Sequence, residues 1–264
     1  MLWVPLRQAK AARKAVVERV AQNPGGRASA GGVDQLALPF GHRSRFARAD
    51  FVAAGSNGAA RAWLLGANPW PEHRLALWGA AGAGKTHLLE IWAREHDAVL
   101  LRGADVTRAT LGELFERPGD ALRAVAVDDA DRADDQQALL HLLNAAREQR
   151  IGLVLAARLA PARWPVVLPD LASRLRATMA IELRQPEDAL LRILLLRHLA
   201  DRQIVVSQPV TEWLLRRLPR TASAIREAAL RLDQAGLAAG RRVTRALAAA
   251  ALHDLLDQEE TRAS

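Results

Sequence analysis

Short apolar runs alternate with amphipathic stretches through the middle of this 264-residue chain. The apolar runs have the length of strands, and the stretches between them carry apolar residues at helical spacing. Strands are therefore expected at 74–78, 98–102, 124–129, 152–157 and 179–183. Strands that alternate with helices indicate a parallel sheet covered by helices on both faces.

The pattern changes after Pro186, beyond which every stretch has helical periodicity. Helices are expected at about 186–202, 208–218, 221–236 and 242–257, and they would form a small bundle. At the other end, residues 3–22 indicate a basic helix, and the glycine-rich residues 23–32 are typical of a flexible linker. The predicted fold class is α/β: a parallel sheet flanked by helices and followed by a C-terminal helical bundle.

Composition narrows the possible functions only slightly. The absence of cysteine excludes disulfides and thiolate metal sites, and no apolar run is long enough to span a membrane, so we expect a soluble cytoplasmic protein. The net charge of +8 is concentrated at residues 1–30 and 202–245. Such a distribution suits a nucleic acid or an acidic partner, but solvated helix faces rich in arginine would give the same pattern.

The first predicted strand leads directly into a phosphate-binding motif. The sequence fits G-x-x-x-x-G-K-[ST] and consists of Gly79, Ala80, Ala81, Gly82, Ala83, Gly84, Lys85 and Thr86. Glycines allow successive backbone N–H groups to turn toward phosphate oxygens, and the helix that follows directs its positive end at the same anion. Lys85 would reach the β- and γ-phosphates, and the Thr86 hydroxyl would be a ligand of Mg²⁺. We therefore expect ATP or ADP, with Mg²⁺, as the cofactor.

The third predicted strand ends in two carboxylates, Asp128 and Asp129. This is the Walker B pattern, in which Asp128 would hold Mg²⁺ opposite Thr86 and Asp129 would orient or deprotonate an attacking water. Two aspartates after a strand are also common in turns and helix caps. The spacing of about 45 residues from the phosphate-binding loop favours the Walker B interpretation.

These motifs together resemble the AAA+ ATPases and, within them, the nucleotide domain of the DnaA replication initiators. The resemblance covers roughly residues 34–257 and rests on the segments 50–57, 84–88, 127–129 and 168–175. Two features are similar to the short regulatory DnaA paralogue Hda. The peptide at residues 35–40 is one, and the chain end about twenty residues after the bundle match, with no space for a helix-turn-helix, is the other; the segment 168–175 also looks like Hda.

A short extended peptide upstream of the core has two possible roles on pattern alone. Its residues Gln35, Leu36, Leu38, Pro39 and Phe40 have the form of a recognition peptide, but they could also form an entry strand. The family resemblance favours recognition, because the peptide is similar to the one with which Hda proteins bind the DNA polymerase sliding clamp. The domains implied are a basic extension and linker at 1–33, an AAA+ domain with the clamp peptide at 34–184, and a helical lid at 185–264.

The resemblance also assigns roles to two arginines. Arg174 occupies the position of the arginine finger, which acts on the nucleotide of a neighbouring subunit. Arg226 occupies the sensor II position, from which it would reach the bound phosphates. Either residue could instead be a solvated surface arginine.

The resemblance implies a regulator that is tethered to the sliding clamp and promotes hydrolysis of ATP bound to DnaA. DnaA and the clamp would be its partners, DNA contact would be indirect, no membrane would be involved, and a homo-oligomer is possible. One departure bears on its own catalysis. The sensor I position, normally a Thr or Ser followed by Asp, reads Ala157-Arg158 here. That change argues for weak intrinsic ATPase activity. An autonomous AAA+ ATPase, such as a helicase loader, and a DNA-binding initiator relative are the alternatives.

Overall fold

The computed structural model describes residues 51–67, 69–116, 122–239 and 242–256, all of which belong to one compact unit. The predicted clamp peptide, Gln35 to Phe40, lies outside these residues. Among the described helices, none is both long and apolar enough to cross a membrane.

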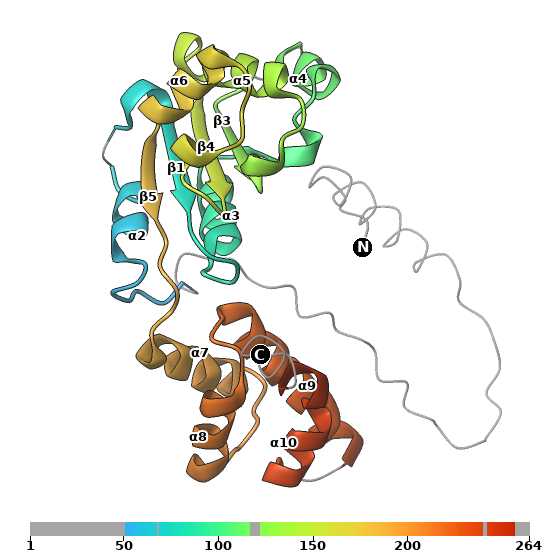
Figure 1. The fold of residues 1–264 in the computed structure, drawn as a ribbon. Coiled ribbons are helices and arrows are strands. Elements are labelled where there is room, and N and C mark those ends of the chain that lie inside the picture. The colour runs from blue at the N-terminus through green and yellow to red at the C-terminus, as the bar shows by residue number, and fades with distance from the viewer. Residues whose placement is uncertain (1–50, 68, 117–121, 240–241, 257–264) are drawn as a thin grey trace, which may run out of the picture. The chain divides into compact units, whose positions relative to one another are not determined.

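A five-stranded parallel sheet forms the centre of the fold, with the strand order β2-β3-β4-β1-β5 (Figure 1). The strands are β1 (Arg74–Trp78), β2 (Val99–Arg102), β3 (Ala124–Asp128), β4 (Gly152–Ala157) and β5 (Met179–Glu182). Every neighbouring pair is parallel, with Leu75 opposite both Val154 and Met179. The parallel sheet predicted from the alternating pattern is confirmed, and because all strands run one way, their carboxyl ends share one edge.

Helices cover both faces of this sheet. They are α2 (Gly58–Leu64), α3 (Lys85–Glu95), α4 (Arg108–Phe115), α5 (Gln136–Glu148) and α6 (Pro169–Ala177). Alternate residues of each strand point to opposite faces, so Val125 and Val127 pack with α4, α5 and α6, whereas Ala124 and Ala126 pack with α2 and α3. Burial of both faces explains why the strands are almost continuously apolar.

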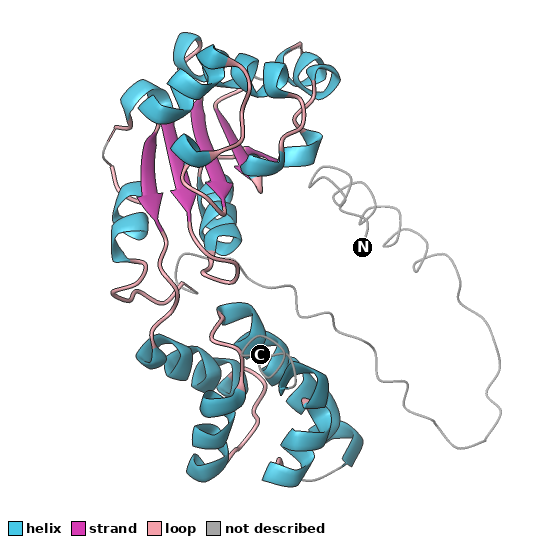
Figure 2. Ribbon diagram, in the orientation of Figure 1, coloured by secondary structure: helices cyan, strands magenta, loops and turns pink. Residues whose placement is uncertain are grey.

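The helices after the sheet form a bundle with an apolar core of its own (Figure 2). They are α7 (Asp188–Ala200), α8 (Gln208–Arg217), α9 (Ala222–Ala239), α10 (Arg245–Ala251) and α11 (His253–Leu256). The sequence predicted a single helix at 242–257. The structure instead divides this stretch at Leu252, which is the C-cap of α10 and is fully buried in the bundle core. We call α7 to α11 the lid.

Candidate nucleotide site

The loop between β1 and α3 has a backbone that only glycine adopts without strain. Gly79, Gly82 and Gly84 have φ angles of 154°, 77° and 102°. Gly79 is also enclosed by strands: its N–H donates to the Ala157 carbonyl at 3.2 Å, and a Cβ on it would overlap the backbone of Leu183. Gly84 is the N-cap of α3, so the loop leads directly into the amino end of that helix. The predicted P-loop residues thus form a turn whose backbone is suited to anions.

Lys85 is held inside this turn. Its side chain is 8% exposed, and Nζ donates hydrogen bonds to the carbonyl oxygens of Gly79 at 2.7 Å and Ala80 at 2.9 Å. Burial lowers the pKa of Lys85, while the carboxylates of Asp128 and Asp129 act in the opposite direction. Among the described residues, the ammonium donates hydrogen bonds only to two neutral carbonyls, so it has no directly bonded counter-charge, and a phosphate group would supply one. The residues therefore fit a nucleotide phosphate.

The carboxylates of Asp128 and Asp129 lie beside the P-loop. The Thr86 hydroxyl donates to Oδ2 of Asp128 at 2.7 Å, and Oδ1 of Asp128 accepts from the Asp129 N–H at 3.0 Å. Asp129 has a left-handed backbone with φ of 49°, and a Cβ on Gly103 would overlap its carbonyl, so glycine at 103 makes room for this turn.

A hydroxyl and a carboxylate are hard oxygen ligands of the kind that Mg²⁺ prefers. In the part of the chain that the structure describes, no three His, Cys, Asp or Glu residues gather to form a metal site by themselves. A Mg²⁺ ion held by Thr86 and Asp128 would therefore need phosphate or water oxygens to complete its shell, which is its usual arrangement with nucleotides.

The altered sensor I position places a cation near the same site. The charge of Arg158 lowers the pKa of Lys85, so the two side chains are close enough to repel. The backbone N–H of Arg158 donates to Oδ2 of Asp131 at 3.0 Å, which fixes the end of β4 to the loop after β3. Sequence reasoning missed Asp131. Its only signal was a third carboxylate shortly after the Walker B pair.

The lid contacts the P-loop at the start of α9. The Ala222 N–H donates to the Gly82 carbonyl at 3.4 Å, and a Cβ on Gly82 would collide with the side chain of Thr221. Arg226 lies just over one turn further along α9, and its positive charge acts on Glu90 of α3. The predicted sensor II arginine is thus near the P-loop helix, where it is solvent-exposed. Thr221 was missed, although a threonine just before a helix is a typical N-cap, and its Oγ1 accepts from the Ala224 N–H.

Arg174 lies near the amino-terminal ends of the strands, whereas the P-loop lies at their carboxyl ends. It belongs to α6, which ends just before β5 begins, and its charge acts on Arg74, the first residue of β1. The P-loop follows the last residue of β1, so the length of a five-residue strand, roughly 16 Å, separates the two edges. The structure therefore places Thr86, Asp128 and Asp129 together beside the P-loop, whereas Arg174 lies at the opposite ends of the strands.

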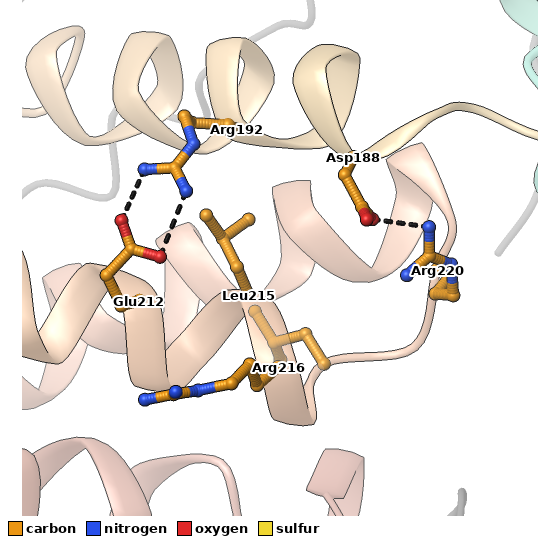
Figure 3. Close-up of a pocket in the computed structure, with 7 residues that line it drawn as sticks. Asp188, Arg192, Glu212, Leu215, Arg216 and Arg220 are labelled. Carbon is orange, nitrogen blue, oxygen red and sulfur yellow. Dashed lines mark hydrogen bonds and ion pairs between the residues drawn. The ribbon is translucent and has the colours of Figure 1, made fainter.

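A separate pocket with a volume of about 420 Å³ lies in the lid, between α7 and α8 (Figure 3). Two ion pairs cross it: Arg192 with Glu212, at 2.5 and 2.9 Å, and Arg220 with Asp188. None of the predicted site residues lines it. Arg220 directly precedes Thr221, so the second ion pair ties the corner that contacts the P-loop to the first turn of α7.

Comparison with known proteins agrees with this arrangement. No family model matches the chain. The chromosomal replication initiator protein DnaA of Cereibacter sphaeroides is 28% identical over 242 residues, which cover 81% of this chain and 52% of that protein. The chain is therefore similar in sequence to a DnaA replication initiator over most of its own length. It spans about half the length of this DnaA relative.

Solved structures show the same fold. Domain III of the Thermotoga maritima initiator DnaA superposes with a TM-score of 0.67 at 16% identity, covering 80% of this chain and 97% of that one. AMPPCP-bound DnaA from Aquifex aeolicus superposes with a TM-score of 0.57 at 18% identity, covering 70% and 63% respectively. The sheet with its flanking helices therefore has the same fold as domain III of DnaA.

Proposed function

We propose that this DnaA-type AAA+ chain is a nucleotide-binding regulator of replication initiation of the Hda kind. It binds the sliding clamp through Gln35 to Phe40 and presents Arg174 to ATP held by DnaA, which promotes hydrolysis there and suppresses re-initiation. ATP or ADP with Mg²⁺ occupies its own P-loop. The observation that carries the proposal is the position of Arg174 at the sheet edge opposite its own P-loop.

Several contacts support nucleotide binding at the P-loop. Lys85 is buried and, among the described residues, donates hydrogen bonds only to carbonyl oxygens; the Thr86 hydroxyl and the Asp128 carboxylate lie within 2.7 Å, and three glycines permit the anion-binding turn. A bound nucleotide would supply the phosphates, and its Mg²⁺ would take Thr86 and Asp128 as ligands. The Aquifex aeolicus relative holds AMPPCP, a nucleotide analogue, which agrees with this assignment.

The proposal that Arg174 acts on a partner's nucleotide rests on its distance from its own P-loop. An arginine finger must contact the γ-phosphate of the nucleotide on which it acts, and Arg174 is separated from its own P-loop by the length of β1. A neighbouring AAA+ molecule that packs its nucleotide site against α6 would bring a γ-phosphate within reach. The arginine stabilises the charge that develops as the terminal phosphoryl group leaves.

Clamp tethering rests on sequence alone, because Gln35 to Phe40 lie outside the described residues. In an extended peptide of this kind, apolar residues fill pockets and the polar residue at its start fixes the register. Tethering would raise the local concentration of Arg174 near newly replicated DNA, in the way that linked modules increase avidity.

The test measures hydrolysis of ATP bound to the DnaA of the same organism, with clamp loaded on DNA. Wild type should convert the bound ATP to ADP, and Arg174→Ala should lose most of this stimulation while still binding clamp. Arg176→Ala removes an exposed arginine two residues away on the same helix and is the matched control. Gln35→Ala should lose clamp binding. Full stimulation by Arg174→Ala would disprove the finger assignment.

An autonomous ATPase is a second candidate, favoured by the intact Thr86–Asp128 contact and by Asp129 beside it. Against it, Arg158 stands where a short polar side chain would help to position water. Purified chain that turns over ATP at about 1 s⁻¹ or faster, without DnaA or clamp, would favour this candidate. Loss of that turnover in Asp129→Asn would assign it to this site.

A further inference from the structure

Among the residues that the structure describes, only Asp170 forms an ion pair or hydrogen bond with the guanidinium of Arg174. Its Nε donates to Asp170, one turn earlier on α6, with distances of 3.3 Å to Oδ2 and 3.2 Å to Oδ1. Neither terminal nitrogen donates a hydrogen bond to any residue that the structure describes. A carboxylate at Nε thus leaves the two terminal NH₂ groups, which form the fork that recognises phosphate, without an acceptor.

The backbone beneath this side chain is fixed. The Thr178 hydroxyl donates to the Arg174 carbonyl at 2.9 Å, and the Thr178 N–H donates to the Leu175 carbonyl at 3.2 Å, so the last turn of α6 is closed. Leu171 and Leu175 of the same helix are buried in the core. The orientation of Arg174 therefore depends on its side-chain contacts rather than on movement of the helix.

One like charge, that of Arg74, lies near Arg174. Arg74, the first residue of β1, is 1% exposed, and its Nε has no partner among the described residues. Burial lowers the pKa of Arg74, and the nearby charges of Arg174 and Arg147 lower it further. The Arg74 guanidinium also pairs with Glu72, so only the part of its charge that this pair leaves acts against a conformation in which Arg174 folds back onto the sheet.

We propose that Asp170 is a positioning residue for the arginine finger, holding the guanidinium by its Nε so that both terminal nitrogens face the γ-phosphate of a partner's nucleotide. This inference rests on the proposed function. Asp170 touches neither nucleotide nor partner phosphate; it acts through Arg174. Pre-orientation of this kind removes the entropy cost of ordering a long side chain when the partner binds.

A purely structural role for the Asp170–Arg174 ion pair makes a different prediction. An acidic residue in the first turn of a helix, paired with an arginine four residues on, slightly stabilises the helix. If that were its whole role, replacing Asp170 would lower the melting temperature slightly and leave the rate of hydrolysis on the partner unchanged.

The experiment compares Asp170→Asn, Asp170→Glu, Arg174→Ala and the double variant Asp170→Asn/Arg174→Ala in the DnaA-ATP assay with loaded clamp. Glu212→Gln is the charge-matched control, because it also removes one carboxylate from an exposed arginine pair, in the lid. Three quantities are measured for each variant: the hydrolysis rate at a saturating concentration of the chain, the concentration that gives half-maximal stimulation, and the melting temperature.

Asp170→Asn should reduce the saturated rate by about ten- to a hundredfold, as expected for misplacement of a catalytic group, with half-maximal concentration and melting temperature nearly unchanged. Asp170→Glu should recover part of the rate, and the double variant should be no slower than Arg174→Ala. Wild-type stimulation by Asp170→Asn, or additive losses in the double variant, would overturn the positioning role while leaving the proposed function intact. Wild-type stimulation by Arg174→Ala would instead refute the proposed function itself.

Discussion

The hydroxyl of Thr86 lies 2.7 Å from Oδ2 of Asp128, although 42 residues separate them in the chain. Thr86 follows β1 and Asp128 ends β3, and β4 lies between these two strands in the sheet. The contact arises because parallel strands bring their carboxyl ends to one edge, where the loops after them converge. This pair is the most direct structural basis for placing Mg²⁺ in the site.

Replacing Thr86 by valine should weaken nucleotide binding only when Mg²⁺ is present. Valine keeps the shape of threonine but lacks the hydroxyl, so we expect a loss of about ten- to a hundredfold in Mg²⁺-dependent affinity. Titration with a fluorescent ADP analogue, once in MgCl₂ and once in EDTA, measures the nucleotide affinity with and without Mg²⁺. Thr110→Val on α4 is the control. An equal loss in EDTA would show that Thr86 contacts the nucleotide or shapes the loop rather than holding the metal.

Replacing Lys85 by methionine should separate stability from ligand binding. Methionine has a similar length and no charge, so it removes the cost of burying an ammonium whose hydrogen-bond partners among the described residues are carbonyl oxygens. The nucleotide-free variant should melt no lower than wild type, yet ADP with Mg²⁺ should no longer raise its melting temperature. Thermal denaturation with and without ADP tests this. Retention of the ADP-induced shift would mean that Lys85 does not bind phosphate.

Replacing Gly79 by alanine should destabilise the fold, because its φ of 154° is unfavourable for alanine and a Cβ would overlap the Leu183 backbone. We expect a loss of roughly 2–4 kcal/mol in unfolding free energy. Gly112→Ala on α4 is the matched control, since a Cβ there meets no atom within 4 Å. That control should gain roughly 0.5–1 kcal/mol from helix propensity. Equal urea midpoints for the two variants would contradict this account of the P-loop.

The sheet and the P-loop could be predicted from the sequence, because both depend on local patterns of residues. Apolar runs of strand length, such as 124–128, and a glycine-rich motif between a strand and a helix can be recognised within a few residues. The pairing of Thr86 with Asp128 followed once the sheet was known to be parallel.

Contacts between distant residues could not be predicted in this way. Nothing near Thr221 in the sequence indicates that its side chain would pack on Gly82, about 140 residues earlier, and Asp131 gave no sign that it would hold the N–H of Arg158. Such contacts depend on how the loops after the strands, and the lid, come together. The break at Leu252 has the same cause, because packing of the bundle core overrides the helical periodicity there.

A carboxyl group at the boundary between core and lid provides the last prediction. Glu90 of α3 is half-buried, and burial raises its pKa; the charge of Asp128 raises it further, while Arg94 and Arg226 act in the opposite direction. Because the folded protein binds the proton on Glu90 more tightly than the unfolded chain does, this group lowers stability as pH rises through the window that starts at its unfolded pKa, about 4.3.

Glu90→Gln should therefore raise the melting temperature at pH 7, by roughly 1–3 °C, and the difference from wild type should disappear below about pH 4, where Glu90 is protonated in both folded and unfolded chains. Glu113→Gln, at an exposed position on α4, is the control and should change the melting temperature little at either pH. A lower melting temperature for Glu90→Gln at neutral pH would mean that attraction to Arg226 and Arg94 outweighs the cost of burial. In that case Glu90 would stabilise the contact between α3 and the lid through its charge, and adding salt should reduce the loss.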